Sequence, residues 1–239
     1  VNIGSDTTYP PHEFIGNGVV MGFDVDVVAA ICERINCKPN WITTAWDGIF
    51  PALVNKQFDM VVSGVTITDE RDKIVDFSDP YIIVDQGVLM RVTEMGATIE
   101  DFKAGTMRLA SQTGTTNAAL GEELVGRDNL RLFDSFNNAV IALQNGDVDG
   151  VIIDSTSATA YEQEFAGELK VQPAILLEQF GKTLVPEPYT ASVILGGMAV
   201  VHGGSASQHG ELLGPMIEGK TSLALGWAER GSRYDSGLV

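Results

Sequence analysis

The sequence has few of the residues that carry metal and thiol chemistry. Its 239 residues include two cysteines, Cys32 and Cys37, and three histidines, at positions 12, 202 and 209. No histidine lies near the cysteine pair in the sequence, so we predict no metal site. The motifs GxSxG and HExxH are also missing, which leaves the catalytic alternatives without support. We therefore predict no catalytic residue and no cofactor.

Basic residues are also scarce. The chain has 15 Lys and Arg against 32 Asp and Glu, a formal net charge of −17. A field of this sign repels phosphate backbones, so nucleic acid is not an expected partner. An acidic surface serves solubility, and it also suits a cationic small ligand.

Long hydrophobic runs are absent as well. No apolar stretch reaches the roughly 18 residues of a membrane span, and the start, VNIGSD, has neither the charged nor the apolar region of a signal peptide. We expect a mature domain from which any leader has been removed.

The chain does contain a regular alternation of strand and helix patterns. Apolar runs bounded by polar turns predict strands, and 3.6-residue periodicity predicts helices. Alternation of this kind is typical of an α/β fold with a mostly parallel sheet. We expect a hairpin tip at 16–22 and strands at 1–5, 41–42, 59–64, 82–92, 107–111, 130–133, 148–153, 169–171 and 198–201. We expect helices at 24–35, 47–56, 136–144, 155–165 and from 115 onward. Asp24 and Asp47 would cap the first two helices, and Phe23, Val27, Ala30 and Ile31 would face the core from the first.

A weak internal repeat favours two similar lobes. Residues 52–62 match residues 142–152, each as a helix, a polar turn and a buried strand. Two lobes of this kind would form a cleft between them. The alternative is that helix–turn–strand units look alike by chance.

The stretch Met60–Tyr81 looks like part of a ligand site. Its strand ends at Ser63 and Gly64, and the loop that follows carries Thr66 and Arg71. Ligands of α/β proteins bind at the carboxyl ends of the strands, and a guanidinium forks two hydrogen bonds onto a carboxylate or phosphate. The alternative for Arg71 is a salt bridge with its acidic neighbours.

Two further strand ends carry polar residues. Gly114, Thr115 and Thr116 follow one strand and open a helix, where free N–H groups can bind an anion, although Thr115 could be only an N-cap. Asp154 ends the buried run VIID. It could meet an ammonium group or cap the next helix.

The first strand also leads into candidate ligand contacts. Asp6 lies at its end, two residues before Thr8-Tyr9, and Tyr9 and Trp46 stand at loop entries. Aromatic rings there could enclose a ligand, or could be half-buried core.

A separate match to a phosphate loop, GPMIEGKT at 214–221, lacks the strand that should precede it, so we do not assign a nucleotide site.

Five segments in order resemble one known family. GFDVDVVAAICERI, WDGIFPAL, SGVTITDERDKIVDFSDPY, QTGTTN and DVDGVIID are similar to segments of the periplasmic solute-binding proteins of polar amino-acid ABC transporters, bacterial family 3. The resemblance is to the lysine/arginine/ornithine–histidine/glutamine group. It covers residues 1–169, is thin over 172–195, and returns in GGMAVVHGGS and WAERGSRYDSGL, without the family's closing tryptophan motif.

The resemblance implies a two-lobed, type II periplasmic-binding-protein fold. Each lobe would be a mostly parallel sheet flanked by helices, with the ligand in the cleft between them. Lobe 1 would be residues 1–84 plus 201–239, the hinge crossovers 85–90 and 196–200, and lobe 2 residues 91–195. The resemblance also favours a disulfide between Cys32 and Cys37, a pair that residue spacing alone leaves open between bridged and free thiols.

The same resemblance assigns the site residues. Arg71 would bind the α-carboxylate, and Asp154 the α-ammonium. Tyr9 and Trp46 would flank the side chain of the ligand, and Asp6 would face the far end of that side chain. The full predicted set is Asp6, Tyr9, Trp46, Ser63, Gly64, Thr66, Arg71, Gln112, Thr115, Thr116 and Asp154, with Ser63 and Gln112 as the weaker assignments.

The expected ligand is a free L-amino acid with a cationic side chain, because Asp6 lies beside aromatic rings. The partners implied are the permease subunits of an ABC importer, with the binding protein a periplasmic monomer. Glutamine or another polar amino acid is one alternative. A dehydratase of the arogenate or prephenate type is another, in which Glu13 or Asp6 would be the general acid.

Overall fold

The computed structural model describes residues 1–172 and residue 207. Residues 1–178 form one compact unit and 179–239 a second. The described part of the first unit carries three sheets. Two of them lie in residues 1–85, which we call the N-terminal lobe, and the third lies in residues 86–172, which we call the middle lobe. The predicted strand at 198–201, the second crossover at 196–200 and the C-terminal part of lobe 1 lie outside the described residues.

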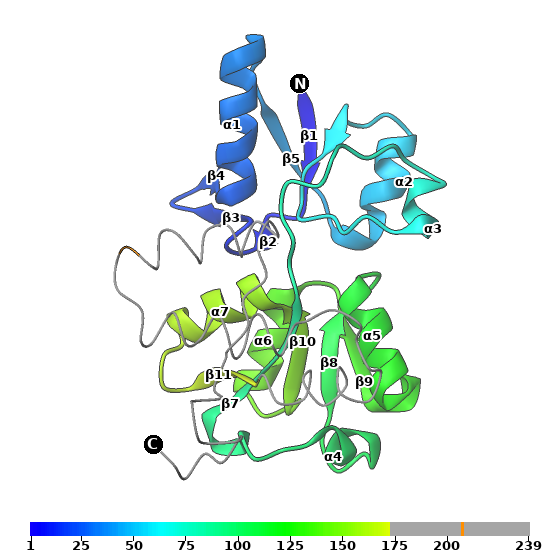
Figure 1. Cartoon of the computed structure of the whole chain (residues 1–239), viewed down its shortest axis with the longest axis vertical. Helices are drawn as coiled ribbons and strands as arrows, with labels where there is room; N and C mark the ends of the chain where they lie inside the picture. The colour runs from blue at the N-terminus through cyan, green and yellow to red at the C-terminus, as the bar shows by residue number, and fades with distance from the viewer. Residues whose placement is uncertain (173–206, 208–239) are drawn as a thin grey trace, which may run out of the picture. The chain divides into compact units, whose positions relative to one another are not determined.

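The N-terminal lobe is built on a three-stranded parallel sheet. Strand β1 (Asn2–Ser5) lies between β5 (Asn40–Thr43) and β6 (Met60–Val61) and pairs in parallel with both. Parallel neighbours need a crossover element between them, and here α1 (Phe23–Ile35) and α2 (Ile49–Val54) provide it. Figure 1 shows α1 alongside β1 and β5.

A small antiparallel sheet follows β1. It contains β2 (Thr8–Tyr9), β3 (Glu13–Gly16) and β4 (Val19–Met21). The chain turns between β3 and β4 at Asn17 and Gly18, which have φ values of 54° and 77°, a conformation that asparagine and glycine tolerate. The predicted hairpin is therefore present, but its tip is shorter than 16–22, because Gly16 ends β3 and residues 19–21 form β4.

Two of the predicted helix caps are wrong. Helix α1 begins at Phe23 with Gly22 as its N-cap residue. Asp24 is fully buried inside the first turn, because its carboxylate accepts the Gly64 N–H at 2.8 Å. Asp47 lies within a 3₁₀ turn, η1 (Trp46–Gly48), ahead of α2.

The predicted core face of α1 is also wrong. The buried residues are Asp24, Val28 and Cys32, whereas Phe23 and Ile31 are 42% and 47% exposed. The buried face of the helix thus includes Asp24, whose carboxylate accepts hydrogen bonds from Gly64 and Tyr81. Val27 is half-buried and Ala30 is exposed.

The middle lobe has a five-stranded sheet of order β11-β7-β10-β8-β9. Three strands run parallel: β10 (Gly150–Asp154), β8 (Leu109–Gln112) and β9 (Leu130–Phe133). Strand β7 (Gln86–Arg91) is antiparallel to β10 and to β11 (Leu169–Gln172). The parallel arrangement expected from sequence thus holds throughout the sheet β5-β1-β6, whereas β7 makes the five-stranded sheet mixed.

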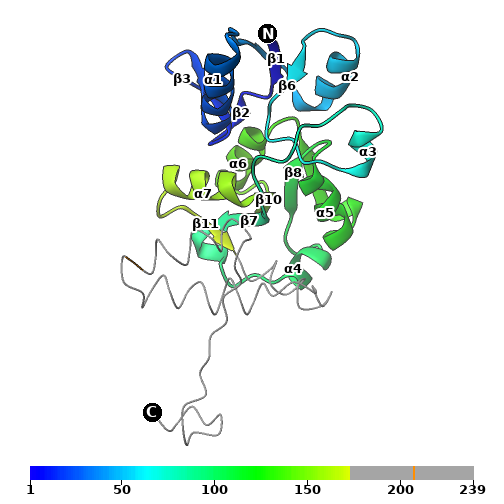
Figure 2. The same ribbon diagram turned by 45° about the horizontal axis from the view of Figure 1, so that its top comes forward.

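Helices cover both faces of this five-stranded sheet. Helices α4 (Ile99–Lys103) and α5 (Thr116–Val125) pack on one face, and α6 (Phe136–Gln144) and α7 (Ser155–Glu164) on the other. These positions can be followed in Figures 1 and 2. Side chains of β10 alternate between the two cores, as a strand requires: Val151 and Ile153 face α6 and α7, and Ile152 faces α4 and α5. The remaining short elements are α3 (Asp69–Asp72), η2 (Val92–Glu94) and η3 (Arg127–Asn129).

The predicted disulfide is present. Cys32 in the last turn of α1 is bonded to Cys37, and this bond closes the short segment through which the helix leads toward β5. We expect replacement of both cysteines by serine to lower the free energy of unfolding by about 2 kcal/mol, the entropy of closing so short a loop. Urea denaturation with and without reductant measures this. If the serine variant and the reduced wild type both unfold at the same urea concentration as the oxidised wild type, the prediction is contradicted.

Candidate ligand-binding site

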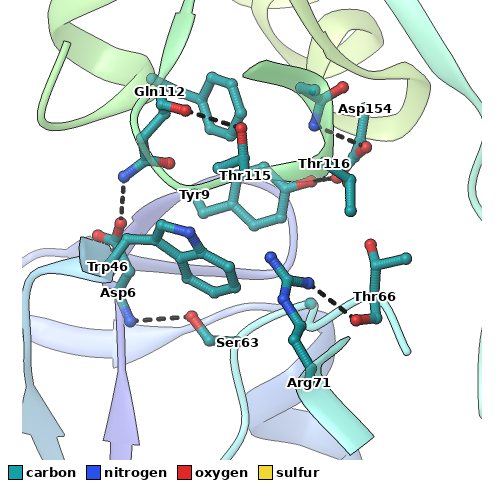
Figure 3. A pocket seen from close by; sticks show the side chains of 13 residues that line it. Asp6, Tyr9, Trp46, Ser63, Thr66, Arg71, Gln112, Thr115, Thr116 and Asp154 are labelled. Carbon is teal, nitrogen blue, oxygen red and sulfur yellow. Dashed lines mark hydrogen bonds between the residues drawn. The ribbon is translucent and has the colours of Figure 1, made fainter. Parts of the chain in front are cut away.

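All eleven predicted site residues line one cavity between the two lobes. Figure 3 shows that their side chains converge from both sides. Asn117 and Phe136 line the cavity as well. The convergence comes from the topology, because Asp6 follows β1, Ser63 and Gly64 follow β6, Gln112 ends β8 and Asp154 ends β10.

Arg71 is held in a defined orientation. Its guanidinium donates to the Thr66 carbonyl at 2.8 Å and, across the cavity, to the Gly114 carbonyl at 3.2 Å. It also lies 5.3 Å from the centre of the Trp46 ring and 5.2 Å from that of Phe50, where cation–π attraction favours it. Burial lowers the pKa of Arg71 while the Asp154 carboxylate raises it, and so high a starting pKa leaves the group charged at neutral pH.

Asp154 occupies the N-cap position of α7, but its carboxylate points into the cavity. One oxygen accepts from the Asn117 amide at 3.0 Å, and the other accepts from the Tyr9 hydroxyl. Burial raises the pKa of Asp154, against the lowering effect of these two hydrogen bonds. The side chain makes no capping hydrogen bond, so Asp154 caps α7 only by its position, and the ammonium contact stays a prediction.

The N-terminus of α5 faces the same space. Thr115 is its N-cap residue, and its hydroxyl accepts from the Ala118 N–H at 3.0 Å and donates to the Gln112 carbonyl at 2.7 Å. Thr115 is therefore the capping residue that the sequence allowed. Thr116 begins the helix, where backbone N–H groups and the helix dipole favour an anion.

Asp6 connects the two lobes at another edge of the cavity. One carboxylate oxygen accepts from the Thr8 hydroxyl at 2.7 Å, and the other from the Gln112 amide at 2.7 Å. Ser63 fixes the backbone, because its hydroxyl accepts the Asp6 N–H at 2.9 Å and donates to buried Glu13 at 2.6 Å. The two weaker assignments, Ser63 and Gln112, thus orient Asp6.

Both predicted aromatic residues span the lobes. Tyr9 belongs to the N-terminal lobe, yet it packs within the core cluster of α6 and α7 and stacks on Phe136 at 5.5 Å between ring centres. Trp46 is 7% exposed and donates its indole N–H to the Gly114 carbonyl at 3.1 Å. Each is both cavity lining and core, so the two interpretations of these residues from sequence are not exclusive.

Gly64 is required by close approach. Its φ of 51° is a conformation that side chains disfavour, and a Cβ there would lie 2.8 Å from the Tyr9 ring. Glycine at this position therefore lets β6 end directly against Tyr9.

Two cavity residues were missed from sequence. Asn117 follows the GTT segment in the first turn of α5, so the helix-start signal could have included it. Phe136 follows the Ser135 cap after β9, and its apolar side chain gave no sign of a site. Its place depends on the contact with Tyr9, which comes from the other lobe.

The described residues also bear on metals and membranes. Within residues 1–172, no group of three or more His, Cys, Asp or Glu side chains could hold a metal ion. None of the helices in this part of the chain is long and apolar enough to cross a bilayer.

Comparison with known proteins identifies relatives. The sequence model of the bacterial extracellular solute-binding proteins, family 3, matches residues 1–146. Two curated relatives are the ABC transporter arginine-binding protein 1 of Escherichia coli K12, 34% identical over 65% of this chain and 63% of its own length, and a probable histidine-binding protein of Neisseria gonorrhoeae, 35% identical over 66% and 60%. The match thus spans about six tenths of the length of these relatives.

Solved structures show the same fold. The arginine-, lysine-, histidine-binding protein ArtJ of Geobacillus stearothermophilus has a TM-score of 0.66 and 33% identity, covering 72% of this chain and 74% of its own. An ancestral arginine-binding protein bound to glutamine has a TM-score of 0.65 and 33% identity, covering 71% and 76%. The two-lobed binding-protein fold expected from sequence is therefore confirmed.

Proposed function

This chain belongs to the bacterial extracellular solute-binding proteins of family 3, and we propose that it binds a free L-amino acid in the cavity between its lobes. The observation that carries the proposal is the pair of opposite charges at that cavity. Arg71 enters from the N-terminal lobe and Asp154 from the middle lobe, as Figure 3 shows. A zwitterion carries a carboxylate and an ammonium on the same carbon, so one molecule could pair with both of these half-buried charges.

The proposed contacts follow from this geometry. The α-carboxylate would meet Arg71 and the backbone N–H groups of Thr66 and Thr116. The α-ammonium would meet Asp154, the Gly64 carbonyl and the Thr66 hydroxyl. Because the ligand would touch both lobes only when they are together, binding would favour the closed arrangement.

We propose a cationic side chain for the ligand. Asp6 supplies a negative charge next to Trp46 and Tyr9, and rings of this kind accept the stem and head of lysine or arginine. Both oxygens of Asp6 already accept hydrogen bonds, but a carboxylate has about four acceptor sites, so room for a ligand donor remains. The relatives named for arginine and histidine binding support the same class.

A thermal-shift screen tests the ligand class. At a concentration 100 times its dissociation constant, a ligand adds about 2.7 kcal/mol to the free energy of unfolding, or roughly 5–10 °C for a domain of this size. We expect L-arginine, L-lysine, L-ornithine or L-histidine to give the largest shift. Glutamine is the competing polar ligand, since a structural relative is bound to it, and a larger shift with glutamine would overturn the cationic assignment.

The affinity should depend on pH in the acid range. The Asp154 carboxylate must be ionised to pair with an ammonium, and burial raises its pKa. Protonation of the free site therefore sets in at a higher pH than for an ordinary aspartate, and affinity should fall as the pH is lowered through that raised pKa. Calorimetric titrations with L-arginine from pH 8 down to pH 4.5 check this. Constant affinity over the range would contradict it.

Binding without catalysis is the function we propose over a dehydratase. Burial and the charge of Asp24 raise the pKa of Glu13 well above its usual range, which suits a general acid. Glu13 is fully buried, however, and does not line the cavity, so it could not reach a substrate bound there. Turnover of a cyclohexadienyl substrate such as arogenate would favour the enzyme.

The wider setting is also a proposal. A binding protein of this family would act outside the cytoplasm, in the periplasm, as a monomer that delivers its ligand to the permease subunits of an ABC importer. The lobe boundaries at 84 and 91, with a crossover at 85–90, remain predictions, and residues 86–91 form β7 of the second sheet.

A further inference from the structure

His12 makes a contact between the lobes outside the cavity. It lies between β2 and β3 and is 2% exposed. Its Nε2 is 2.8 Å from the hydroxyl oxygen of Thr156, which lies in the first turn of α7, two residues after Asp154. The N-terminal lobe is thus hydrogen-bonded to the helix that begins at the proposed ammonium contact.

Neighbouring rings hold the imidazole in this orientation. Its ring stacks on Tyr9 at 5.0 Å between centres and meets the edge of Phe23 at 6.3 Å. Tyr9 in turn stacks on Phe136 and donates to Asp154. Movement of His12 would therefore displace the Tyr9 ring, which lines the cavity.

The second imidazole nitrogen faces a carboxylate. Nδ1 lies 3.8 Å from one oxygen of Asp24, whose other oxygen accepts from the Gly64 N–H and the Tyr81 hydroxyl at 2.8 and 3.0 Å. A carboxylate on this side favours the proton on Nδ1, so that Nε2 is left to accept from the Thr156 hydroxyl. In this tautomer the Thr156 hydroxyl is the donor of the bond between the lobes.

We propose that His12 and Thr156 form a latch that positions Asp154 against the N-terminal lobe and lengthens the residence time of the bound amino acid. The consequence for residence time rests on the function proposed above. Separation of the lobes must break the bond, so every release of ligand includes that step, whereas encounter with the open protein does not. The latch should therefore act on the dissociation rate and leave the association rate nearly unchanged.

Substitutions at Thr156 isolate the bond. Thr156→Val keeps the shape and removes the hydroxyl, which leaves the buried Nε2 without its partner. We expect L-arginine to dissociate about 5- to 30-fold faster from this variant in stopped-flow measurements, with association changed less than about twofold. Thr156→Ser restores the hydroxyl and should return the dissociation rate to near that of wild type.

His12→Phe completes the test. Phenylalanine can keep the stack on Tyr9 while it removes both ring nitrogens, Nε2 at Thr156 and Nδ1 at Asp24. If the two residues act through their mutual bond, His12→Phe with Thr156→Val should be no worse than the more damaging single change. Additive effects of the two changes on the dissociation rate would overturn the latch.

A distance measurement decides the latch without any ligand. Glu33 on α1 and Glu123 on α5 are exposed, and both native cysteines are in the disulfide, so spin labels attached to the double variant E33C/E123C report the distance between the lobes. We expect Thr156→Val, but not Thr156→Ser, to move population to longer distances. If the wild-type protein does not bind L-arginine, the proposed ligand class is wrong. The distance measurement still tests the latch in that case, because it is made without ligand. Identical distributions in the Val and Ser variants would overturn the latch.

Discussion

Replacement of Arg71 by methionine is expected to weaken binding of every amino acid by about 100- to 10,000-fold. Two charge-assisted hydrogen bonds to a carboxylate contribute about 1.5–3 kcal/mol each, and methionine supplies neither. The guanidinium is already oriented by Thr66, Gly114 and the Trp46 ring, so little ordering cost offsets its contribution. Calorimetric titration with L-arginine measures the loss.

The matched control is an exposed arginine of the same lobe. Arg34 in the last turn of α1 donates to the Ala30 carbonyl at 2.8 Å and lies outside the cavity lining. We expect Arg34→Met to leave the affinity within about twofold, as is usual for surface substitutions. If Arg71→Met bound L-arginine as well as Arg34→Met does, the carboxylate contact would have to be placed elsewhere.

Replacement of Asp154 by asparagine should remove binding to a similar degree. The change keeps the volume and still allows contacts with Tyr9 and Asn117, but the ammonium loses its counter-charge. We expect at least about a 100-fold loss for all amino acids tested, because a charged partner left buried and unpaired is costly. Loss for cationic amino acids alone would instead make Asp154 a side-chain contact.

The same substitution should not destabilise the fold, which separates binding from folding. Burial raises the pKa of Asp154, so the charged form is disfavoured in the folded state, and this cost is present once the pH rises above the ordinary aspartate value. Asparagine carries no charge, and at neutral pH the melting temperature should be equal to or above that of wild type. Exposed Asp128→Asn is the control and should change neither quantity.

The sequence was most informative where chemistry lies at a strand end. Arg71, Asp154 and Asp6 could be predicted because polar side chains that follow buried strands gather at the carboxyl edge of each sheet. The structure brings the residues from the two sheets to one cavity. Their roles as ligand contacts stay predictions until binding is measured.

Contacts between residues far apart in the sequence could not be predicted from local pattern. Asp24 suggested a helix cap, but its hydrogen bonds go to Gly64 and Tyr81, 40 and 57 residues away. Phe136 was predicted only as the start of a helix, and it lies at the cavity where it stacks on Tyr9. The same holds for His12 and Thr156, which are 144 residues apart. Periodicity reports which face of an element is apolar, and it carries no information on which distant polar group will draw a side chain inward.

One titration tests the central claim that Arg71 and Asp154 hold the two charges of an amino acid. L-Arginine and agmatine, which is arginine without its carboxylate, are titrated separately into the same wild-type protein. Agmatine keeps the amine and the guanidinium but offers nothing to Arg71, so we predict that it binds at least about 100-fold more weakly than L-arginine. Equal affinity for the two compounds would show that the α-carboxylate contributes nothing to binding and would contradict the claim.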